Sequence, residues 1–533
     1  MNDKTKIGYQ EEEVSPGLRL LNKGRKSLVR AVFSRLGLIV LLLLFQLFLF
    51  FFFIHWLTEY LPHFLLISVV FSAFMILYLL NTDTDPTAKI TWLLVIALMP
   101  ALGAPLYCYT RSNLGMRILR QRLRLLIDTT RDNIAQDPQV LERLRQESPG
   151  TAALARYLRR SGCFPVYEHT AVKYFPLGED KWEELLRQLE QAEHFIFLEY
   201  FIIDEGLMWG RVLEILARKA AQGLEVRVMY DGTCEFSTLP HDYPKRLEEL
   251  GIKCKMFAPM TPFISTHYNY RDHRKIAVID GHTAFTGGVN LADEYINRRR
   301  RHGHWKDTAV MLQGEAARSF TLMFLQMWNI DEPEPEIDRF LEYPCRPREQ
   351  ARGYVLPYGD CPLDDDKVGE RVYMDILNRA RDYVYIMSPY LILDGEMETA
   401  LKFAAERGVD VRLVLPGIPD KKAPWALAKT HYASLLASGV KIYEYSPGFV
   451  HAKVFVSDDM KAVVGTINLD YRSLYHHFEC AAYLYKTDCI KDIKADVENT
   501  IAASSRVGQD SMSREKLYIR LLGFLMKALA PLM

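Results

Sequence analysis

Three long apolar stretches near the N-terminus dominate the hydrophobic pattern. Residues 36–57 contain no Asp, Glu, Lys or Arg, and further apolar stretches follow at residues 61–80 and 90–109. Each is long enough to cross a bilayer as a helix. Aromatic residues that favour membrane interfaces stand near their ends, at Trp56, Tyr60, Trp92, Tyr107 and Tyr109. The pattern predicts a multi-pass transmembrane region over residues 36–110, and the first stretch starts too far in and is too long for a cleaved signal peptide.

Basic residues flank this region on both sides. The N-terminal tail, residues 1–35, and the segment 111–166, which is predicted to be an amphipathic helical linker, are both rich in Lys and Arg next to the apolar stretches. Three complete spans would place these flanks on opposite sides of the membrane, against the positive-inside tendency. Either one stretch is therefore re-entrant, or one flank departs from that tendency. The basic flank favours a cytoplasmic position for the large domain.

From about residue 167 the pattern changes to alternating strands and helices. A continuous apolar run at 195–203 predicts a strand buried on both faces, followed by a helix at 210–222 and a strand at 225–230. The same order returns as a strand at 383–387, a helix at 396–407 and a strand at 411–415. A repeat of this size is a whole domain. We expect two pseudo-symmetric α/β/α domains, at 167–335 and 336–510, that form one central site, and a C-terminal amphipathic segment at 511–533.

Composition narrows the class of partner. Lys and Arg total 66, and Asp and Glu also total 66, so no overall field attracts nucleic acid. The eight cysteines form no CxxC pair, which favours free thiols over a zinc site or a disulfide framework.

The chemistry is indicated by a motif that occurs twice. His273, Lys275 and Asp280 have the same spacing as His451, Lys453 and Asp458. Each set precedes a cluster of small and polar residues, which comprises Thr286, Gly287, Gly288 and Asn290 in the first copy and Gly465, Thr466 and Asn468 in the second. Because a single match could be an ordinary strand pair, the duplication carries the inference.

This spacing suits a phosphodiester substrate. Residues two apart on a strand face the same side, so each imidazole projects into the cleft beside an ammonium. One neutral histidine can attack phosphorus while the other, protonated, donates to the leaving oxygen. The lysines can stabilise charge on phosphoryl oxygens without a metal, and the small clusters can bring backbone N–H groups close. No cofactor is predicted.

The two motifs resemble the paired HKD motifs of the phospholipase D superfamily, and the chain is most similar to the bacterial cardiolipin synthases. The segments that carry this closer likeness are residues 92–107, with Pro100 and Gly103, and residues 464–473. One departure is the additional first apolar stretch, because such enzymes typically show two.

The resemblance implies a mechanism and partners. His273 would attack a phosphatidyl phosphorus to form a phosphatidyl-histidine, and His451 would protonate the departing glycerol and later activate a second phosphatidylglycerol. Lys275 and Lys453 would hold phosphate oxygens, assisted by Asn290 and Asn468. The implied partners are phosphatidylglycerol, as donor and acceptor, and the lipid bilayer of a bacterial inner membrane. The oligomeric state stays open.

Four further features are interpreted less directly. An acceptor must fix the tautomer of each histidine; Glu479 is the candidate for the second half, and Asp293 or Glu294 for the first. His302, His304, His476 and His477 lack a metal-binding spacing, so they are interpreted as structural or substrate-lining, with no metal. Residues 517–529 suit either an interfacial helix or a helix packed on the domain. The motifs also permit hydrolysis by a phospholipase D or a nuclease, or a non-catalytic scaffold, although the intact His and Lys residues argue against the last.

Overall fold

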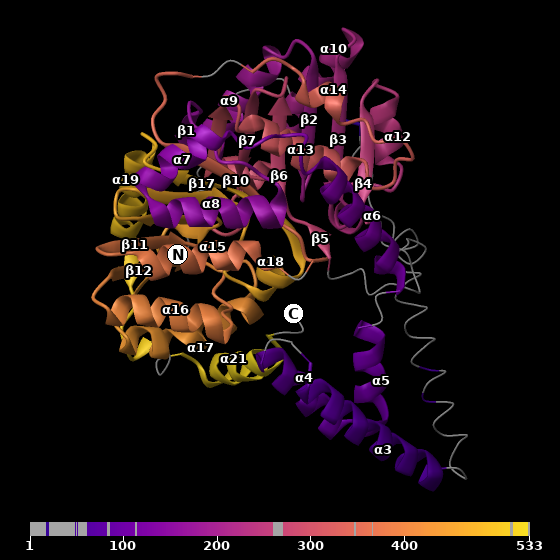
Figure 1. Ribbon diagram of the computed structural model, residues 1–533. Helices are drawn as coiled ribbons and strands as arrows, with labels where there is room; N and C mark the ends of the chain where they lie inside the picture. Colours follow the sequence, from indigo (N-terminus) through magenta and orange to yellow (C-terminus); the bar gives the residue numbers. More distant parts are fainter. Residues whose placement is uncertain are drawn as a thin grey trace, which may run out of the picture.

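The computed structural model describes residues 18–20, 48, 51, 61–82, 86–111, 114–258, 270–345, 348–364, 366–511 and 515–530. An α/β body holds two sheets, one above the other in Figure 1, and α3 (Leu61–Leu80), α4 (Pro86–Leu98) and α5 (Pro100–Arg111) project from it. The mixed α/β fold class predicted from the sequence is confirmed.

The first sheet has the strand order β1-β9-β7-β6-β2-β3-β4. Its strands are β1 (Ala171–Phe175), β2 (Phe195–Tyr200), β3 (Glu225–Asp231), β4 (Lys253–Phe257), β6 (Lys275–Ile279), β7 (Thr283–Gly287) and β9 (Ala309–Gln313). Strands β2, β3 and β4 pair in parallel, whereas β6, β7, β9 and β1 extend the sheet antiparallel. All residues of β2 are buried, as its apolar run predicts.

The second sheet repeats this order as β10-β17-β16-β15-β11-β12-β13, with β18 (Ser504–Arg506) added at the edge. Its strands are β10 (Tyr354–Asp360), β11 (Tyr383–Met387), β12 (Asp410–Pro416), β13 (Lys441–Tyr445), β15 (Val454–Ser457), β16 (Lys461–Gly465) and β17 (His477–Tyr485). Each of these seven strands has a counterpart at the same place in the first sheet, as expected for a repeat.

Helices cover both sheets. The first half has α9 (Gly178–Glu190), α10 (Leu207–Ala221), α11 (Cys234–Ser237), α12 (Tyr243–Glu248) and the 3-10 helix η3 (Asp293–Ile296). The second half has α15 (Val368–Arg379), α16 (Gly395–Glu406), α17 (Lys422–Ala437), α18 (Tyr471–Tyr475) and α19 (Ile490–Ala502). Helix α10 ends where Gly223 takes φ +92°, a conformation that glycine adopts without strain.

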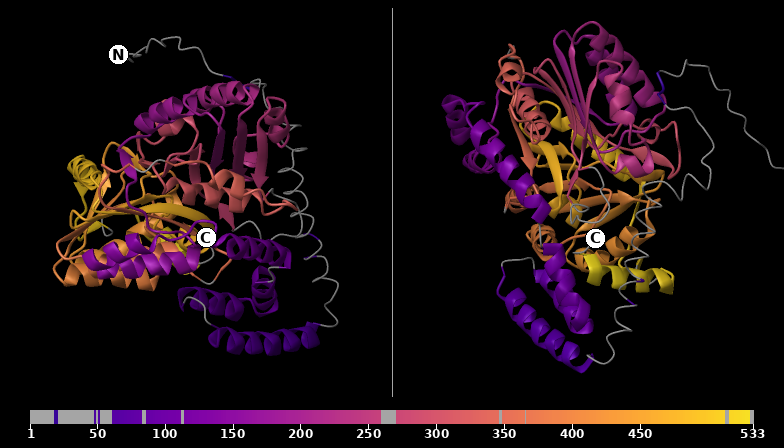
Figure 2. Two further views of the ribbon diagram at one scale, coloured as in Figure 1. Left: turned by 45° about the horizontal axis from the view of Figure 1, so that its top comes forward. Right: turned by 90° about the vertical axis from the view of Figure 1, so that its right-hand side faces the viewer.

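The linker and the passage between the halves are also helical. Residues 111–166 contain α6 (Leu114–Thr130), α7 (Pro138–Glu147) and α8 (Pro149–Gly162), and α13 (Ala317–Trp328) and α14 (Asp338–Leu341) lead into the second half. Helix α13 contacts strands of both sheets, and eleven of its twelve residues are buried. It is therefore a central element of the core, and Figure 2 shows the two sheets stacked around it.

The N-terminal helices differ from the sequence prediction. Residues 61–80 form one helix, as expected, but the predicted span at 90–109 is wrong because α4 ends at Leu98 and α5 begins at Pro100. Proline disfavours helical backbone at the residue before it, and Gly103 lets the two helices fold against each other, since a Cβ there would lie 2.6 Å from the Val95 carbonyl oxygen. Within the described part of the chain, no helix combines the length and apolar character needed to cross a membrane. Nearly all of the predicted span at 36–57 lies outside the described residues.

Candidate active site

Two short parallel strand pairs join the halves at the site. Strand β5 (Arg271–Asp272) pairs with His477 and Phe478 at the start of β17, and β14 (Gly448–Val450) pairs with β8 (His304–Lys306). Just beyond the first pair, the His273 amide donates to the Phe478 carbonyl at 2.9 Å. Just beyond the second, the His451 amide donates to the Lys306 carbonyl at 2.7 Å. Each motif histidine is thus fixed by the backbone of the opposite half.

A carboxylate from that opposite half orients each imidazole. His273 Nδ1 lies 2.9 and 3.0 Å from the two carboxylate oxygens of Glu479, and His451 Nδ1 lies 2.6 Å from Asp307 Oδ2. All four residues are buried. An Nδ1–H that donates to a carboxylate leaves Nε2 with its lone pair, which is the tautomer that a nucleophile or general base needs.

The two motif lysines are buried beside these pairs. Lys275 Nζ donates to the His273 carbonyl at 2.5 Å, and Lys453 Nζ donates to the His451 carbonyl. Burial lowers the pKa of Lys275 to about 8 and that of Lys453 to about 7, although Glu479 and Asp307 respectively oppose the shift. An anionic phosphate placed between these lysines would restore their full charge, so the cleft favours such a ligand.

Burial also keeps both motif histidines neutral. The pKa of His273 falls well below its ordinary value because the ring is desolvated and because Lys275, Lys453 and His451 lie within its field. Burial, reinforced by Lys453 and opposed by Asp307, lowers the pKa of His451 to about 4. The two His-Lys sets therefore lie within electrostatic reach of each other. Neutral imidazoles suit nucleophilic attack and proton removal near neutral pH.

The predicted acceptors are corrected by this geometry. Glu479 orients His273 of the first half, and not the second-half histidine for which it was the candidate. Asp293 does not orient a histidine: its carboxylate accepts the Leu207 and Met208 amides at the start of α10, at 3.1 and 2.9 Å. Glu294, the stated alternative, lies 3.5 Å from Arg299. Both residues are half-buried in η3, where one carboxylate lies at a helix terminus and the other near an arginine.

Asp307 is the functional residue that sequence reasoning missed. The sequence does contain a signal, because Gly287 pairs with Ala309 as Gly465 pairs with Ala481. Two residues before these alanines stand Asp307 and Glu479, which are therefore equivalent in the repeat. Aligning the two halves on their last common strand would have identified Asp307 from Glu479.

The motif aspartates lie at the far ends of their strands. Asp280 accepts the Glu193, His194 and Phe195 amides, each at 2.8 Å. Asp458 accepts the Arg381, Asp382 and Tyr383 amides, each at 3.0 Å. Both aspartates take a positive φ, 51° and 54°, at the turn that ends β6 or β15. These contacts are structural, and they fix the strand that neighbours each motif strand.

The small residues of the clusters make room for the acids. A Cβ at Gly288 would lie 2.0 Å from Asp307 Oδ1, so any other residue would displace that carboxylate. Thr466, its counterpart, donates its hydroxyl to Glu479. Asn290 accepts the Ile202 amide at Oδ1 and donates from Nδ2 to the Tyr295 hydroxyl. Asn468 donates to Asp470, and its buried Oδ1 has no hydrogen bond among the described residues.

His477 is a third imidazole at the site. Its ring centroid lies 5.3 Å from that of His273, and its Nδ1 lies 3.7 Å from Glu479 Oε1. The side chain is buried, and neither ring nitrogen has a hydrogen-bond partner in the described part of the chain. His273, His477 and Glu479 offer ligand atoms within 4.8 Å of one another, which makes them the described group best placed to hold a metal ion.

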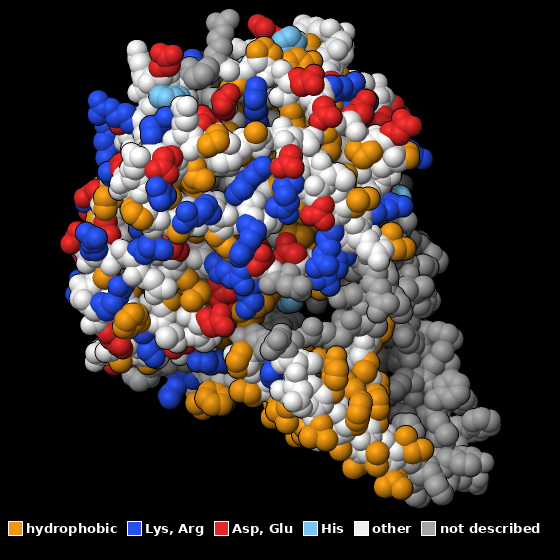
Figure 3. All heavy atoms as spheres, viewed as in Figure 1, with side chains coloured by type: hydrophobic (Ala, Val, Ile, Leu, Met, Phe, Trp, Pro, Cys, Tyr) orange, Lys and Arg blue, Asp and Glu red, His pale blue; other side chains and the backbone are white. Residues whose placement is uncertain are grey.

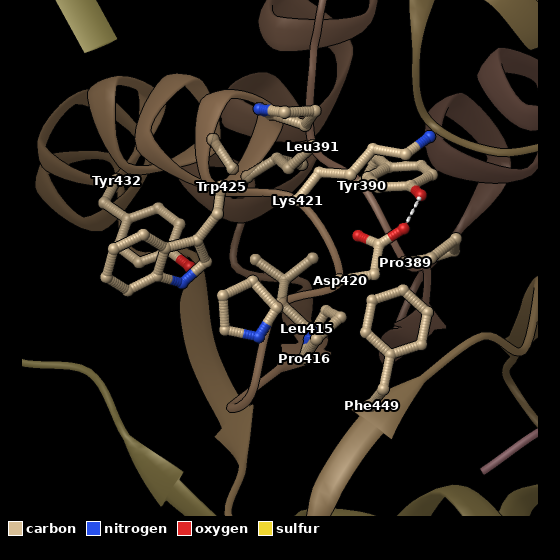
Figure 4. Close-up of a pocket in the computed structure, with 13 residues that line it drawn as sticks. Pro389, Tyr390, Leu391, Leu415, Pro416, Asp420, Lys421, Trp425, Tyr432 and Phe449 are labelled. Atoms are coloured by element: carbon tan, nitrogen blue, oxygen red, sulfur yellow. Dashed lines mark hydrogen bonds between the residues drawn. The ribbon is translucent and has the colours of Figure 1, made fainter. Parts of the chain in front are cut away.

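An apolar recess adjoins the second-half histidine. The Phe449 ring stacks on His451 with centroids 6.0 Å apart, and it also lines a small recess of about 20 Å³ between β12 and α17. Figure 4 shows Tyr390, Leu415 and Trp425 facing this space, with the Tyr390 hydroxyl donating to Asp420 at 2.7 Å.

Comparison with known protein families shows which family this chain belongs to. The family described as "Cardiolipin synthase, PLD-like domain" matches residues 185–328 and 373–501, and the family described as "Phospholipase_D-nuclease N-terminal" matches residues 67–108. A cardiolipin synthase of Alkalihalophilus pseudofirmus is 31% identical over 471 residues, which cover 88% of this chain and 92% of that protein. The chain belongs to the bacterial cardiolipin synthases of the phospholipase D superfamily. It is accordingly a phospholipase D-type phosphatidyltransferase.

Two further proteins are similar to this chain. An uncharacterized protein of Streptococcus mutans is 58% identical over 458 residues, covering 86% of this chain and 99% of that protein. The crystal structure of the phosphatidylserine synthase of Haemophilus influenzae Rd KW20 has a TM-score of 0.53 and 14% identity, and the match covers 68% of this chain and 93% of that one. The latter shows a shared fold, in agreement with the cardiolipin synthase family assignment.

Proposed function

We propose that this chain condenses two phosphatidylglycerol molecules to cardiolipin and glycerol at the cytoplasmic face of a bacterial inner membrane. The observation that carries the proposal is the pair of neutral imidazoles, each held by an acid of the opposite half, with two lysines beside them. Two histidines around one phosphorus permit displacement in two steps, with a covalent intermediate between donor and acceptor.

The roles follow from these contacts. The negative charge of a bound donor phosphate favours protonation of His451, which takes a proton from solvent at Nε2. His273 Nε2 then attacks the donor phosphorus, the phosphorus–oxygen bond to the glycerol headgroup breaks, and protonated His451 gives its Nε2 proton to the glycerol oxygen and becomes neutral. Neutral His451 then removes a proton from the acceptor hydroxyl, which attacks the phosphatidyl-histidine and releases His273. Lys275 and Lys453 stabilise the charge on the phosphoryl oxygens in both steps.

The membrane location is supported by the surface of the N-terminal helices and by the thiols. Large apolar side chains of α3, α4 and α5 are exposed, among them Leu66, Phe74, Ile90 and Leu106. All eight cysteines are free, as in a reducing compartment.

The decisive experiment gives the purified full-length protein phosphatidylglycerol in mixed micelles and follows lipids and released glycerol. Cardiolipin and glycerol in equal amounts support the proposal, whereas phosphatidic acid would show hydrolysis and overturn it. His273→Ala is expected to lower turnover by at least about 10⁴-fold, because the covalent route is lost. His241→Ala, an exposed histidine in the first half, is the matched control and should leave turnover unchanged.

Two further arms of this experiment test the chemistry. Quenching in alkaline denaturant, which preserves a phosphorus–nitrogen bond, should leave label from phosphorus-labelled lipid on the peptide that contains His273. Addition of a chelator should leave turnover unchanged, and a loss restored by a metal would place an ion at His273, His477 and Glu479 and contradict the metal-free steps.

A further inference from the structure

The C-terminal helix α21 (Leu517–Leu529) is apolar on two opposite faces. The inner face packs on α17, with Gly523 so close that a Cβ would lie 2.5 Å from the Ala426 carbonyl oxygen. The outer face exposes large apolar side chains at the spacing of one helical stripe, and Phe524 is 80% exposed. The stripe consists of Leu517, Leu521, Phe524 and Leu525, with Tyr518 beside it.

Contacts at both ends prevent this helix from turning its outer face inward. Lys429 of α17 forms an ion pair with Glu515, just before the helix begins. Near its end, the Ala528 carbonyl accepts the Thr91 hydroxyl of α4 at 2.9 Å. Helix α21 therefore links the α/β body to the N-terminal helices, and its apolar stripe is held outward.

The stripe continues onto the N-terminal helices. Figure 3 shows hydrophobic side chains gathered along the lower part of this face, over α21 and over α3 and α4. The exposed large apolar side chains of these two helices include Ile90, Leu94 and Leu98 of α4 and Leu77 of α3. Segments more than 400 positions apart in the sequence thus form one apolar surface.

The cationic side chains around the stripe favour an anionic lipid surface as its partner. Lys516, Arg520 and Lys527 are exposed at its margin, and residues 516–529 contain no Asp or Glu. Two copies paired through this helix would bring six cations together without a carboxylate from the helix. Anionic headgroups would neutralise the same cations while the apolar side chains enter the acyl region.

We propose that α21 lies flat in the surface of a bilayer that contains anionic lipid, and that it forms a single lipid-facing surface with α3 and α4. Neither matched family extends to this helix, because the last matched residue is 501. The proposal concerns docking alone and does not require the chemistry of the two histidines.

The test measures whether residue 524 meets acyl chains. Full-length Phe524→Trp protein is reconstituted into vesicles of phosphatidylglycerol and phosphatidylcholine whose acyl chains are brominated, and tryptophan quenching is compared with that of the parent protein. Phe403→Trp is the matched control, since Phe403 is 52% exposed on α16 of the α/β body. We expect at least twofold stronger quenching of the added tryptophan at position 524 than at position 403.

Three more arms give the proposal other ways to fail. Replacing Lys516, Arg520 and Lys527 together by Gln should weaken quenching at position 524 at least twofold. Equal quenching at positions 524 and 403, or an L521E/F524E protein that changes from dimer to monomer in detergent, would overturn the proposal in favour of solvent or a second copy. The same comparison in a His273→Ala background is expected to be unchanged, so failure of docking and failure of the transferase reaction are separable.

Discussion

At the scale of residues, the site depends on two acids that act through histidines of the other half. Asp307 is fully buried, and although burial alone would raise its pKa, His451 and Lys453 hold that pKa below its ordinary value. It is therefore an anion that stabilises the protonated form of His451 and fixes its ring. Asp307 touches no reacting atom, so it is a positioning residue.

Asp307→Asn should lower kcat by about 10²–10⁴-fold, because an amide no longer enforces the Nδ1–H tautomer or stabilises the imidazolium. KM for phosphatidylglycerol should change little, and steady-state kinetics separate the two parameters. Asp293→Asn is the matched control. It should weaken the cap of α10 and lower the free energy of unfolding by about 1 kcal/mol, while kcat stays unchanged. Equal kcat values for the two variants would contradict the role of Asp307.

The histidines and lysines could be predicted from the sequence because their spacing is local and occurs twice. The pairing of His273 with Glu479 could not, because it spans 206 positions and crosses between the halves. Local spacing carries no information about which half supplies the acid, and it led to Asp293, whose carboxylate serves a helix terminus instead.

At the scale of elements, the motif aspartates hold strands in register. Asp280 joins the end of β6 to the start of β2, and Asp458 does the same for β15 and β11. The sequence places them correctly at strand ends, but the motif alone groups them with the catalytic residues. Their role depends on the neighbouring strand, which comes from a distant part of the chain.

Asp280→Ala should lower the free energy of unfolding by about 2–4 kcal/mol, because three backbone amides lose a charged acceptor. Urea denaturation measures this change. Asp280→Asn keeps one acceptor and should fall between the parent and the alanine variant. A loss of activity in Asp280→Ala without loss of stability would show instead that this carboxylate takes part in the chemistry.

The N-terminal helices show that mean hydropathy alone does not predict where a helix ends. Averaging over residues 90–109 hides Pro100 and Gly103, which divide this stretch into α4 and α5. The repeat of the α/β body was predictable because buried strands and glycine-ended helices leave strong patterns in both halves.

At the scale of the whole molecule, the three buried imidazoles of the site make stability sensitive to acid. Burial lowers the pKa of His477 to about 3 and that of His451 to about 4, and it holds the pKa of His273 well below 6.5. Between these values and about pH 6.5, the unfolded chain binds protons that the folded chain does not. Stability is therefore complete above about pH 6.5 and falls as the pH drops.

Each of these histidines should contribute up to about 1.4 kcal/mol of lost stability per pH unit within that window. Thermal unfolding at pH 7.5 and pH 5 measures the total. His477→Asn should reduce the acid sensitivity by one histidine's share, whereas His241→Ala, at an exposed position, should not. Identical acid sensitivity in the parent and in His477→Asn would show that His477 is protonated in the folded protein.

The strand pairs β5–β17 and β8–β14 have a consequence for how such a chain can change over time. Neither half, folded by itself, would carry an imidazole together with its own anion. A deletion or a damaging substitution in one half removes the carboxylate that orients the histidine of the other half. Neither motif can therefore replace the other. Selection therefore acts on the two motifs together.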